Sequence, residues 1–545
     1  MLNFGLCLAR VAASKGGSEW YAGKSPCSLN LFNNNPNPSY IMTARPTHGG
    51  FIRLEDLIHL HDNGADNFES VGEAAPGECV VNLNAYDYLF KDLVANPDNL
   101  LDNTPEVIKA LKDLGLAMKE NADAFEPDSE IPAAYTYLGQ FIDHDISRDA
   151  ASDDIRRAPF DTTWFEPIPS GRLRTELKNV RSGTFDLDSV YGGNPPLDKH
   201  EMFEIGEVSY AIQQIPGKDI RNDLPRIPDG SRLAAIGDSR NDENTIIAQL
   251  HVAMLKFHNA VMQKLNIGFK EAQKIVRQHY QWIVIHDFLK KICDTEVVND
   301  ILLNGNKLYK PTDDNFFMPV EFSAAAYRFG HSMVRESYNF NRAHEGSNLA
   351  QLFRFSGSSG DLGGMPTLQR DWIIEWDRFL PFSGDNHNRA RKVNTRLSGA
   401  LQHLAGPGIG VFQILAKINL LRGYLFSLPT GQAVARAVLE NEEDMLSSED
   451  ILENATAAEK SALISAGLQC KTPLWYYILA EASWKAKGAH LGKLGSKIVA
   501  ETIIGLIRRS TDSILNEENW KPSLGEDFNL QQLIIFSDLG PAKVA

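Results

Sequence analysis

Apolar side chains recur every three or four residues along most of the chain after residue 100, which is the spacing of one face of an α-helix. Alternating strand patterns are scarce, and no internal repeat is present. The pattern predicts a mainly α-helical domain with little sheet. The predicted helical segments are 105–121, 245–265, 273–292, 408–421, 430–440, 456–468, 474–487 and 496–515.

Two long connections, 150–245 and 335–400, interrupt the helical pattern. They exceed the loops that compact domains usually contain, and long ordered loops tend to hold functional sites. Residues 1–45 are rich in Asn, Pro, Gly and Ser, which predicts an arm that wraps around the domain or extends from it. We therefore expect one large helical domain with long ordered loops over residues 46–545.

Composition excludes several classes of protein. The 545 residues are 43% hydrophobic, enough for a large core, and carry 70 acidic against 54 basic side chains. The net charge of −16 repels nucleic acid phosphates, so nucleic acid is not expected as a partner. Five cysteines without paired spacing fit neither a disulfide scaffold nor a zinc ribbon.

Targeting signals are weak. No window approaches the roughly 20 apolar residues of a membrane span. Residues 1–12 lack the basic start of a secretory signal. The default expectation is a soluble protein, cytoplasmic unless exported without a standard signal, and of undetermined oligomeric state.

Four polar stretches are candidates for chemistry, and the first is YLGQFIDHD at 137–145. It places Gln140 and His144 on one helix face, with Asp143 and Asp145 beside the histidine. One interpretation is a solvated helix end. The other is a catalytic base flanked by two carboxylates, one facing a ligand and one facing a metal.

The second stretch is SGTFDLDSVYGG at 182–193, whose alternating oxygens project from one side of an extended loop. Calcium requires six to eight oxygen ligands of this kind. The alternative is a polar turn before a short strand-like segment, SVYG. The candidate calcium ligands are Ser182, Thr184, Asp186 and Asp188, with Asp145 as a further carboxylate.

In the third stretch Arg240 and Glu243 stand three residues apart before an amphipathic helix. A fixed guanidinium could polarise an oxygen ligand, although an ion pair at a helix start is the alternative. His251 and His258 follow on one apolar stripe. We expect them to be structural, because no third zinc ligand accompanies them.

The fourth stretch, EFSAAAYRFGHSMV at 321–334, places His331 among small apolar residues with Arg328 just before it. His331 is either a core histidine or a metal ligand. Downstream, Asn419 and Arg422 lie one helical turn apart. A metal-bound imidazole normally donates its second N–H to a partner such as this asparagine.

Taken together and in this order, the four stretches resemble the animal haem peroxidases of the peroxidase-cyclooxygenase superfamily, which includes myeloperoxidase and lactoperoxidase. The resemblance implies a haem peroxidase domain that holds haem b and calcium. It also implies reduction of hydrogen peroxide and oxidation of halide, thiocyanate or small organic donors through an oxo-iron porphyrin-radical intermediate.

The resemblance also implies a role for each matching residue. His144 matches the distal base, Gln140 its neighbour over the haem, and Arg240 the distal arginine. His331 matches the iron ligand and Asn419 its hydrogen-bond partner.

Further matches concern how the cofactors are held. Arg328 and Arg422 match arginines that meet the haem propionates. Asp143 and Glu243 stand where relatives form ester bonds to haem methyl groups, so the haem could be covalently attached. The family's calcium site matches Asp145, Ser182, Thr184, Asp186 and Asp188.

Two departures from the family pattern affect the expected chemistry. Asn244 stands where myeloperoxidase has the methionine of its third haem link, which puts chloride oxidation in doubt. Tyr327 lies four residues before His331, whereas the radical-forming tyrosine of cyclooxygenases lies three before. One residue turns an α-helical side chain by about 100°. This offset makes a fatty-acid dioxygenase the second interpretation and not the first. A non-catalytic haem-binding or adhesion protein that keeps the fold is a further alternative.

Overall fold

A computed structural model describes residues 52–53, 83–120, 126–152, 155, 158–192, 222–227, 230–382, 384–402 and 414–540. The arm predicted at 1–45 and the start of the helix predicted at 408–421 lie outside these residues. Across the described part, no helix has the length and apolar character needed to cross a membrane.

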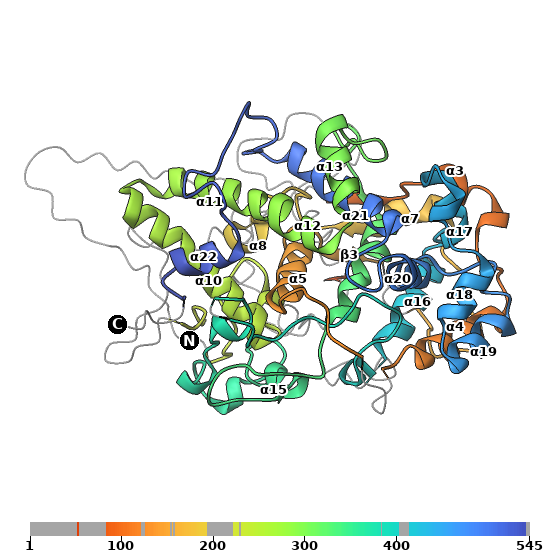
Figure 1. The fold of residues 1–545 in the computed structure, drawn as a ribbon, viewed down its shortest axis with the longest axis horizontal. Helices are drawn as coiled ribbons and strands as arrows, with labels where there is room; N and C mark the ends of the chain where they lie inside the picture. Colours follow the sequence, from red (N-terminus) through yellow and green to blue (C-terminus); the bar gives the residue numbers. More distant parts are fainter. Residues whose placement is uncertain are drawn as a thin grey trace, which may run out of the picture.

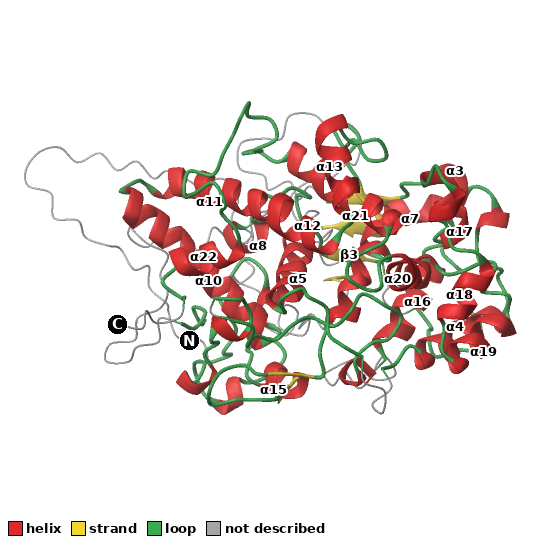
Figure 2. Ribbon diagram, in the orientation of Figure 1, coloured by secondary structure: helices red, strands yellow, loops and turns green. Residues whose placement is uncertain are grey.

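The described chain is mainly helical with little sheet, as predicted (Figures 1 and 2). Helix α5 lies at the centre, with α10 and α11 on one side and α16 to α20 on the other (Figure 1). The α-helices are α3 (Lys91–Val94), α4 (Pro105–Ala117), α5 (Ala134–Ile146), α7 (Ser170–Glu176), α8 (Asp188–Tyr191), α10 (Thr245–Leu265), α11 (Phe269–Ile283), α12 (Leu289–Ile292), α13 (Thr295–Asn304), α14 (Val320–Ser323), α15 (Leu349–Arg354), α16 (Leu415–Leu425), α17 (Gly431–Val438), α18 (Ser448–Asn454), α19 (Ala457–Ser465), α20 (Leu474–Lys485), α21 (Lys493–Arg509) and α22 (Leu530–Phe536).

Shorter elements join these helices. The 3₁₀ helices are η1 (Pro97–Asn99), η2 (Ser239–Asp242), η4 (Ala326–Met333), η5 (Leu362–Gly364), η6 (Arg370–Trp372), η7 (Trp376–Arg378), η8 (Gly399–Gln402) and η9 (Glu442–Asp444), and η3 (Val284–Phe288) is a π-helical turn. The strands are β1 (Ile52–Arg53), β2 (Asn84–Asp87), β3 (Asp149–Ala151), β4 (Leu177–Asn179), β5 (Met318–Pro319), β6 (Ser337–Tyr338) and β7 (Ser347–Asn348). They form a five-stranded sheet in the order β1-β3-β4-β2-β5 and a β6–β7 pair.

Local signals explain where α10 begins and ends. The Asn244 side chain accepts a hydrogen bond from the Ile247 amide at 3.0 Å, which caps the first turn. Asn266, with a φ of 54°, ends the helix in the left-handed region. The prediction of a helix over 245–265 is thus confirmed.

Two predicted elements differ from the structure. The helix predicted over 273–292 is divided into α11, η3 and α12, and its π-helical turn is of the kind often found at functional sites. The strand-like segment after the polar loop is instead the short helix α8. Its amides bond back along the chain, from Tyr191 to the Leu187 carbonyl at 2.7 Å and from Gly192 to the Asp188 carbonyl at 2.9 Å.

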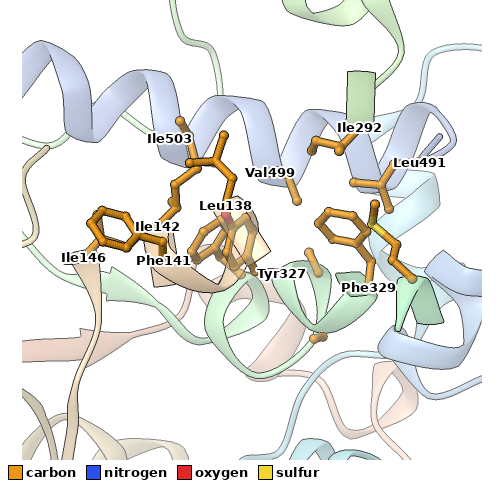
Figure 3. Packing of buried hydrophobic residues seen from close by; sticks show 14 of the residues in the cluster. Leu138, Phe141, Ile142, Ile146, Ile292, Tyr327, Phe329, Leu491, Val499 and Ile503 are labelled. Atoms are coloured by element: carbon orange, nitrogen blue, oxygen red, sulfur yellow. The ribbon is translucent and has the colours of Figure 1, made fainter. Parts of the chain in front are cut away.

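The core between α21, α5 and η4 positions the candidate site (Figure 3). Val499 and Ile503 of α21 face Leu138 and Ile142 of α5, and Phe329 of η4 packs in the same layer. Helix α5 and η4 also contact each other directly. Burial of this apolar surface therefore holds two chemistry-bearing segments, far apart in the sequence, beside one another.

Candidate functional site

Helix α5 presents the predicted base. His144 is buried, and its Nδ1 lies 2.8 Å from Oδ1 of Asn241. Burial lowers the pKa of His144 to about 4, and the charge of Arg240 lowers it as well; the carboxylates of Glu243, Asp238 and Asp143 do not offset this. The imidazole is therefore neutral at physiological pH.

Gln140, one turn before His144, is tied to the start of α10. Its Nε2 donates to Oε1 of Glu243, and its Oε1 accepts from Nδ2 of Asn244 at 3.3 Å. Both ends of the Gln140 amide are thus fixed. Asn244 has two structural roles: it caps α10 and orients Gln140.

Arg240 lies against the carboxyl end of α5. Its Nη2 donates to Oδ2 of Asp238 at 2.7 Å and to the Ser147 carbonyl at 2.6 Å, and it also contacts the His144 carbonyl at 3.2 Å. Burial would lower the pKa of Arg240, but the Asp238 carboxylate raises it far above its usual range. The structure thus brings a permanent cation beside His144, held by Asp238.

On the opposite side, η4 carries His331, whose Nδ1 lies 2.8 Å from Nδ2 of Asn419 on α16. Rotation of the Asn419 amide by 180° exchanges its nitrogen and oxygen, and Oδ1 of Asn419 can then accept a hydrogen bond from Nδ1–H of His331. In that arrangement Nε2, and not Nδ1, is the ring nitrogen whose lone pair could ligate a metal ion. The structure thus brings these two residues into contact, with the amide nitrogen of Asn419 facing Nδ1 of His331.

Two guanidiniums lie near this side of the site. Arg422, one turn after Asn419, is buried, and burial lowers its pKa to about 10; the nearby charge of Arg328 lowers it further. Burial would raise the pKa of Asp143, but Arg328 and Arg240 outweigh this and lower it. Asp143 is therefore ionised, and Ser147 Oγ donates to its Oδ1 at 2.9 Å.

One cavity joins these segments. Its empty volume, open mouth included, is about 910 Å³, within the range of roughly 300–1,000 Å³ that is usual for ligand pockets. His144, Arg240, Asn419 and Arg422 are not among the described residues on its wall. The site residues that line it are Gln140, Asp143, Glu243, Arg328 and His331, with apolar and aromatic side chains between them.

The residues present fit a haem. An imidazole from η4 stands on the cavity wall, and two guanidiniums near this side could meet the two carboxylates of the cofactor. Gly330, beside His331, also lines the cavity, and a Cβ added there would meet no atom within 4 Å. A flat ligand can therefore approach this backbone closely.

The predicted calcium residues gather beside α5. Ser189 donates from its amide to Oδ1 of Asp145 at 3.1 Å, and Ser182 Oγ donates to Oδ2 of Asp188 at 2.6 Å. Burial raises the pKa of Asp145 to about 8, and the Asp188 carboxylate adds to this. Oδ1 of Asp186 is buried without a hydrogen-bond partner among the described residues. A bound cation would stabilise the ionised form of Asp145 and would give Oδ1 of Asp186 a partner.

This cluster is not a preformed cage. No group of three or more His, Cys, Asp or Glu side chains in the described ranges is arranged to hold a metal ion. The hydroxyls of Ser182 and Thr184 instead bond to each other at 2.7 Å. Binding of calcium would require these oxygens to turn toward the ion.

Two features of the site were not predictable from the sequence pattern. Asn241 contacts His144, but nothing in a polar 3₁₀ turn marks one asparagine as the partner of a distant imidazole. Tyr327 lines the cavity together with His331. The one-residue offset was expected to turn Tyr327 from this position, but the cavity reaches Tyr327 as well as His331.

Comparisons with known proteins agree with the sequence motifs. Residues 166–363 match the family model described as animal haem peroxidase. A peroxidase-like protein of Margaritifera margaritifera is 26% identical over 267 residues, which are 40% of this chain and 33% of that protein. Thyroid peroxidase of Canis lupus familiaris is 26% identical over 202 residues, 31% of this chain and 21% of that protein.

Solved structures share the fold. Peroxidase A of Dictyostelium discoideum has a TM-score of 0.54 at 15% identity and covers 85% of this chain and 94% of its own. A fatty acid alpha-dioxygenase of Oryza sativa has a TM-score of 0.50 at 12% identity and covers 84% of this chain and 79% of its own. At these identities the similarity concerns the fold alone.

The aligned segments span a third or less of the two curated relatives. The segment matched by the family model contains the candidate calcium loop, Arg240, Glu243 and His331. The resemblance predicted from the motifs is confirmed: this chain is related to the animal haem peroxidase family.

Proposed function

We propose that this chain is a haem-dependent peroxidase that reduces hydrogen peroxide and oxidises a small anionic or organic donor. One observation carries the proposal. A single cavity is lined by Gln140 and Asp143 from α5, Glu243 before α10, and Arg328 and His331 from η4. His331 could ligate a haem iron in this cavity, and Arg328 could meet a haem carboxylate.

Residues on one side of the cavity would hold the cofactor. Bound haem supplies the redox chemistry of peroxide reduction. Nε2 of His331 would ligate the iron, and Asn419 would accept its Nδ1–H, which makes the imidazole a stronger donor. Arg328 and Arg422 would pair with the two carboxylates of the cofactor.

Residues on the other side would move the proton. Neutral His144 accepts a proton from hydrogen peroxide at Nε2 and returns it to the departing oxygen. Arg240 contributes a permanent positive charge beside this imidazole, and we assign to it the stabilisation of charge on that oxygen. Gln140, oriented by Glu243 and Asn244, shapes the space in which peroxide lies.

Two finer features belong to the proposal. Asp143 and Glu243 line the cavity and could form ester bonds to the haem. Asp145, which follows His144, would bind calcium together with the loop residues Ser182, Thr184, Asp186 and Asp188. A calcium ion there would fix the end of α5 and thus the position of the base.

A fatty-acid dioxygenase is the second candidate, because Tyr327 lies on the wall of the same cavity as His331. Its hydroxyl donates to the Gly139 carbonyl at 3.2 Å. Incubation with a polyunsaturated fatty acid and product analysis decides between the two candidates. Oxygenated fatty acid without added donor would favour the dioxygenase.

The test begins with the absorption spectrum of the purified full chain, before and after acidic organic extraction. Haem that remains with the protein indicates covalent attachment, and Asp143→Asn with Glu243→Gln should release it. Peroxide-dependent oxidation of a phenolic donor or of iodide then tests the activity. A haem-loaded protein without such activity contradicts the proposal and favours a non-catalytic haem-binding protein.

A further inference from the structure

Three side chains from three elements form a buried chain behind the cavity. Nδ1 of His144, on α5, lies 2.8 Å from Oδ1 of Asn241 in η2. Nδ2 of Asn241 lies 3.0 Å from Nδ1 of His251 on α10. All three residues are at most 1% exposed. The order is therefore His144, Asn241, His251.

With the Asn241 amide oriented as in the structure, its chemistry assigns the protons along this chain. An amide oxygen can only accept, so Nδ1 of His144 must carry a proton, and its Nε2 has a bare lone pair. An amide nitrogen can only donate, so Nδ1 of His251 must accept. If the Asn241 amide were reversed, both imidazoles would take the opposite tautomer.

We propose that Asn241 and His251 are positioning residues that set the tautomer of His144, so that its Nε2 can accept a proton. The inference rests on the proposed function of His144 as a base. Asn241 holds the imidazole through its oxygen, and His251 favours this orientation of the amide when its Nδ1 is the unprotonated ring nitrogen. Neither residue needs to touch peroxide: His251 acts on Asn241, and Asn241 acts on His144.

Two observations support a specific arrangement over simple packing. His251 and His258 lie on the same helix, and each bonds through Nδ1, His258 to the Tyr191 hydroxyl at 2.7 Å. Only His251 is connected to the base. In addition, Asn241 directly follows Arg240 in η2, so one short turn places both the permanent cation and the orienting amide against α5.

Cyanide association with the ferric haem of the loaded full chain provides the test. Cyanide arrives as hydrogen cyanide and binds as the anion, so its association needs a base in the correct tautomer. Asn241→Leu should slow association at least about tenfold, since general-base assistance typically contributes 10²–10⁴-fold. Asn241→Asp keeps an acceptor for Nδ1–H and should stay within about threefold of the unmodified protein.

The contact between Asn241 and His251 is tested with a matched pair of variants. His251→Leu removes the acceptor that fixes the amide and should slow cyanide association about three- to tenfold, because two orientations become available. His251→Gln offers Oε1 as an acceptor and should restore the rate. His258→Leu, which removes a buried histidine from the same helix, should leave it unchanged. Thermal midpoint and haem content are measured for every variant.

Two results would overturn the inference. The first is cyanide association at the unmodified rate in Asn241→Leu. The second is association in Asn241→Asp as slow as in Asn241→Leu, which would indicate packing alone. If Asn241→Leu does not fold, the His251→Leu and His251→Gln pair decides in the same way.

A second measurement is independent of haem. The ¹⁵N spectrum of the full chain with labelled histidine, assigned with His144→Ala, reports which ring nitrogen of His144 carries the proton. A proton on Nδ1 supports the inference, and a proton on Nε2 overturns it. Absence of haem binding would overturn the proposed function while leaving this result interpretable.

Discussion

Nδ1 of His331 in η4 lies 2.8 Å from the side-chain amide of Asn419 on α16, which joins two segments that are distant in the sequence. If this bond makes His331 a more electron-rich iron ligand, its loss should be visible at the haem. Asn419→Leu should raise the reduction potential of the haem, and Asn419→Asp should lower it. Spectroelectrochemistry measures both. His331→Ala should change the haem spectrum itself, and an unchanged spectrum would remove His331 as the iron ligand.

His144→Ala should lower the rate of peroxide reaction by about 10²–10⁴-fold, because the base is lost while the haem stays bound. Arg240→Ala should also lower it by orders of magnitude. Stopped-flow spectroscopy of the haem band measures these rates.

The pH dependence of the same reaction follows from the pKa of His144, which burial lowers to about 4. The neutral form is the base, so the rate should be constant from neutral pH down to about 5. Below about 4 it should fall roughly tenfold for each pH unit, because the imidazole becomes protonated. A decline centred near 6.5 would show that His144 titrates like an exposed histidine and would contradict this prediction.

Replacing Asp186 and Asp188 together by Asn should weaken calcium binding, since two carboxylate ligands of the loop are lost. Removal of calcium with a chelator should lower the thermal midpoint of the unmodified protein and leave that of the double variant unchanged. Metal analysis and thermal unfolding measure the two effects. Asp538→Asn, at an exposed position, serves as the control. An unchanged calcium content in the double variant would exclude this loop as the site.

Glu481 should make the protein less stable as the pH rises. Its carboxylate is buried and accepts bonds from the Leu494 and Gly495 amides, and burial raises its pKa to about 7 from an ordinary 4.5. Between these values the folded form holds a proton that the unfolded form has lost. The free energy of unfolding should therefore fall by about 3 kcal/mol between pH 4.5 and 7.

The comparison with Glu481→Gln isolates this contribution. The amide does not titrate, so the difference in unfolding free energy between the two proteins should change with pH over that window. Urea unfolding at several pH values measures it. A difference that is constant with pH would show that Glu481 ionises normally in the folded protein.

The sequence by itself determined the helical class and many of the helices, because apolar periodicity and capping residues act locally. The helix over 245–265 is the clearest example: Asn244 begins it and Asn266 ends it. The candidate residues were also recognisable, since the motifs around His144, Arg240 and His331 have residue types in a specific order. These signals lie within a few neighbouring positions.

Tertiary structure decided how those residues meet. Tyr327 lines the cavity between α5 and η4, where its hydroxyl donates to the Gly139 carbonyl, and Arg240 is held by Asp238 at the end of α5. Asn241 became part of the site only when η2 packed against α5 and α10. Long-range contacts of this kind depend on the burial of whole helices, and a local pattern of residues contains no information about which side chain a distant segment will bring near.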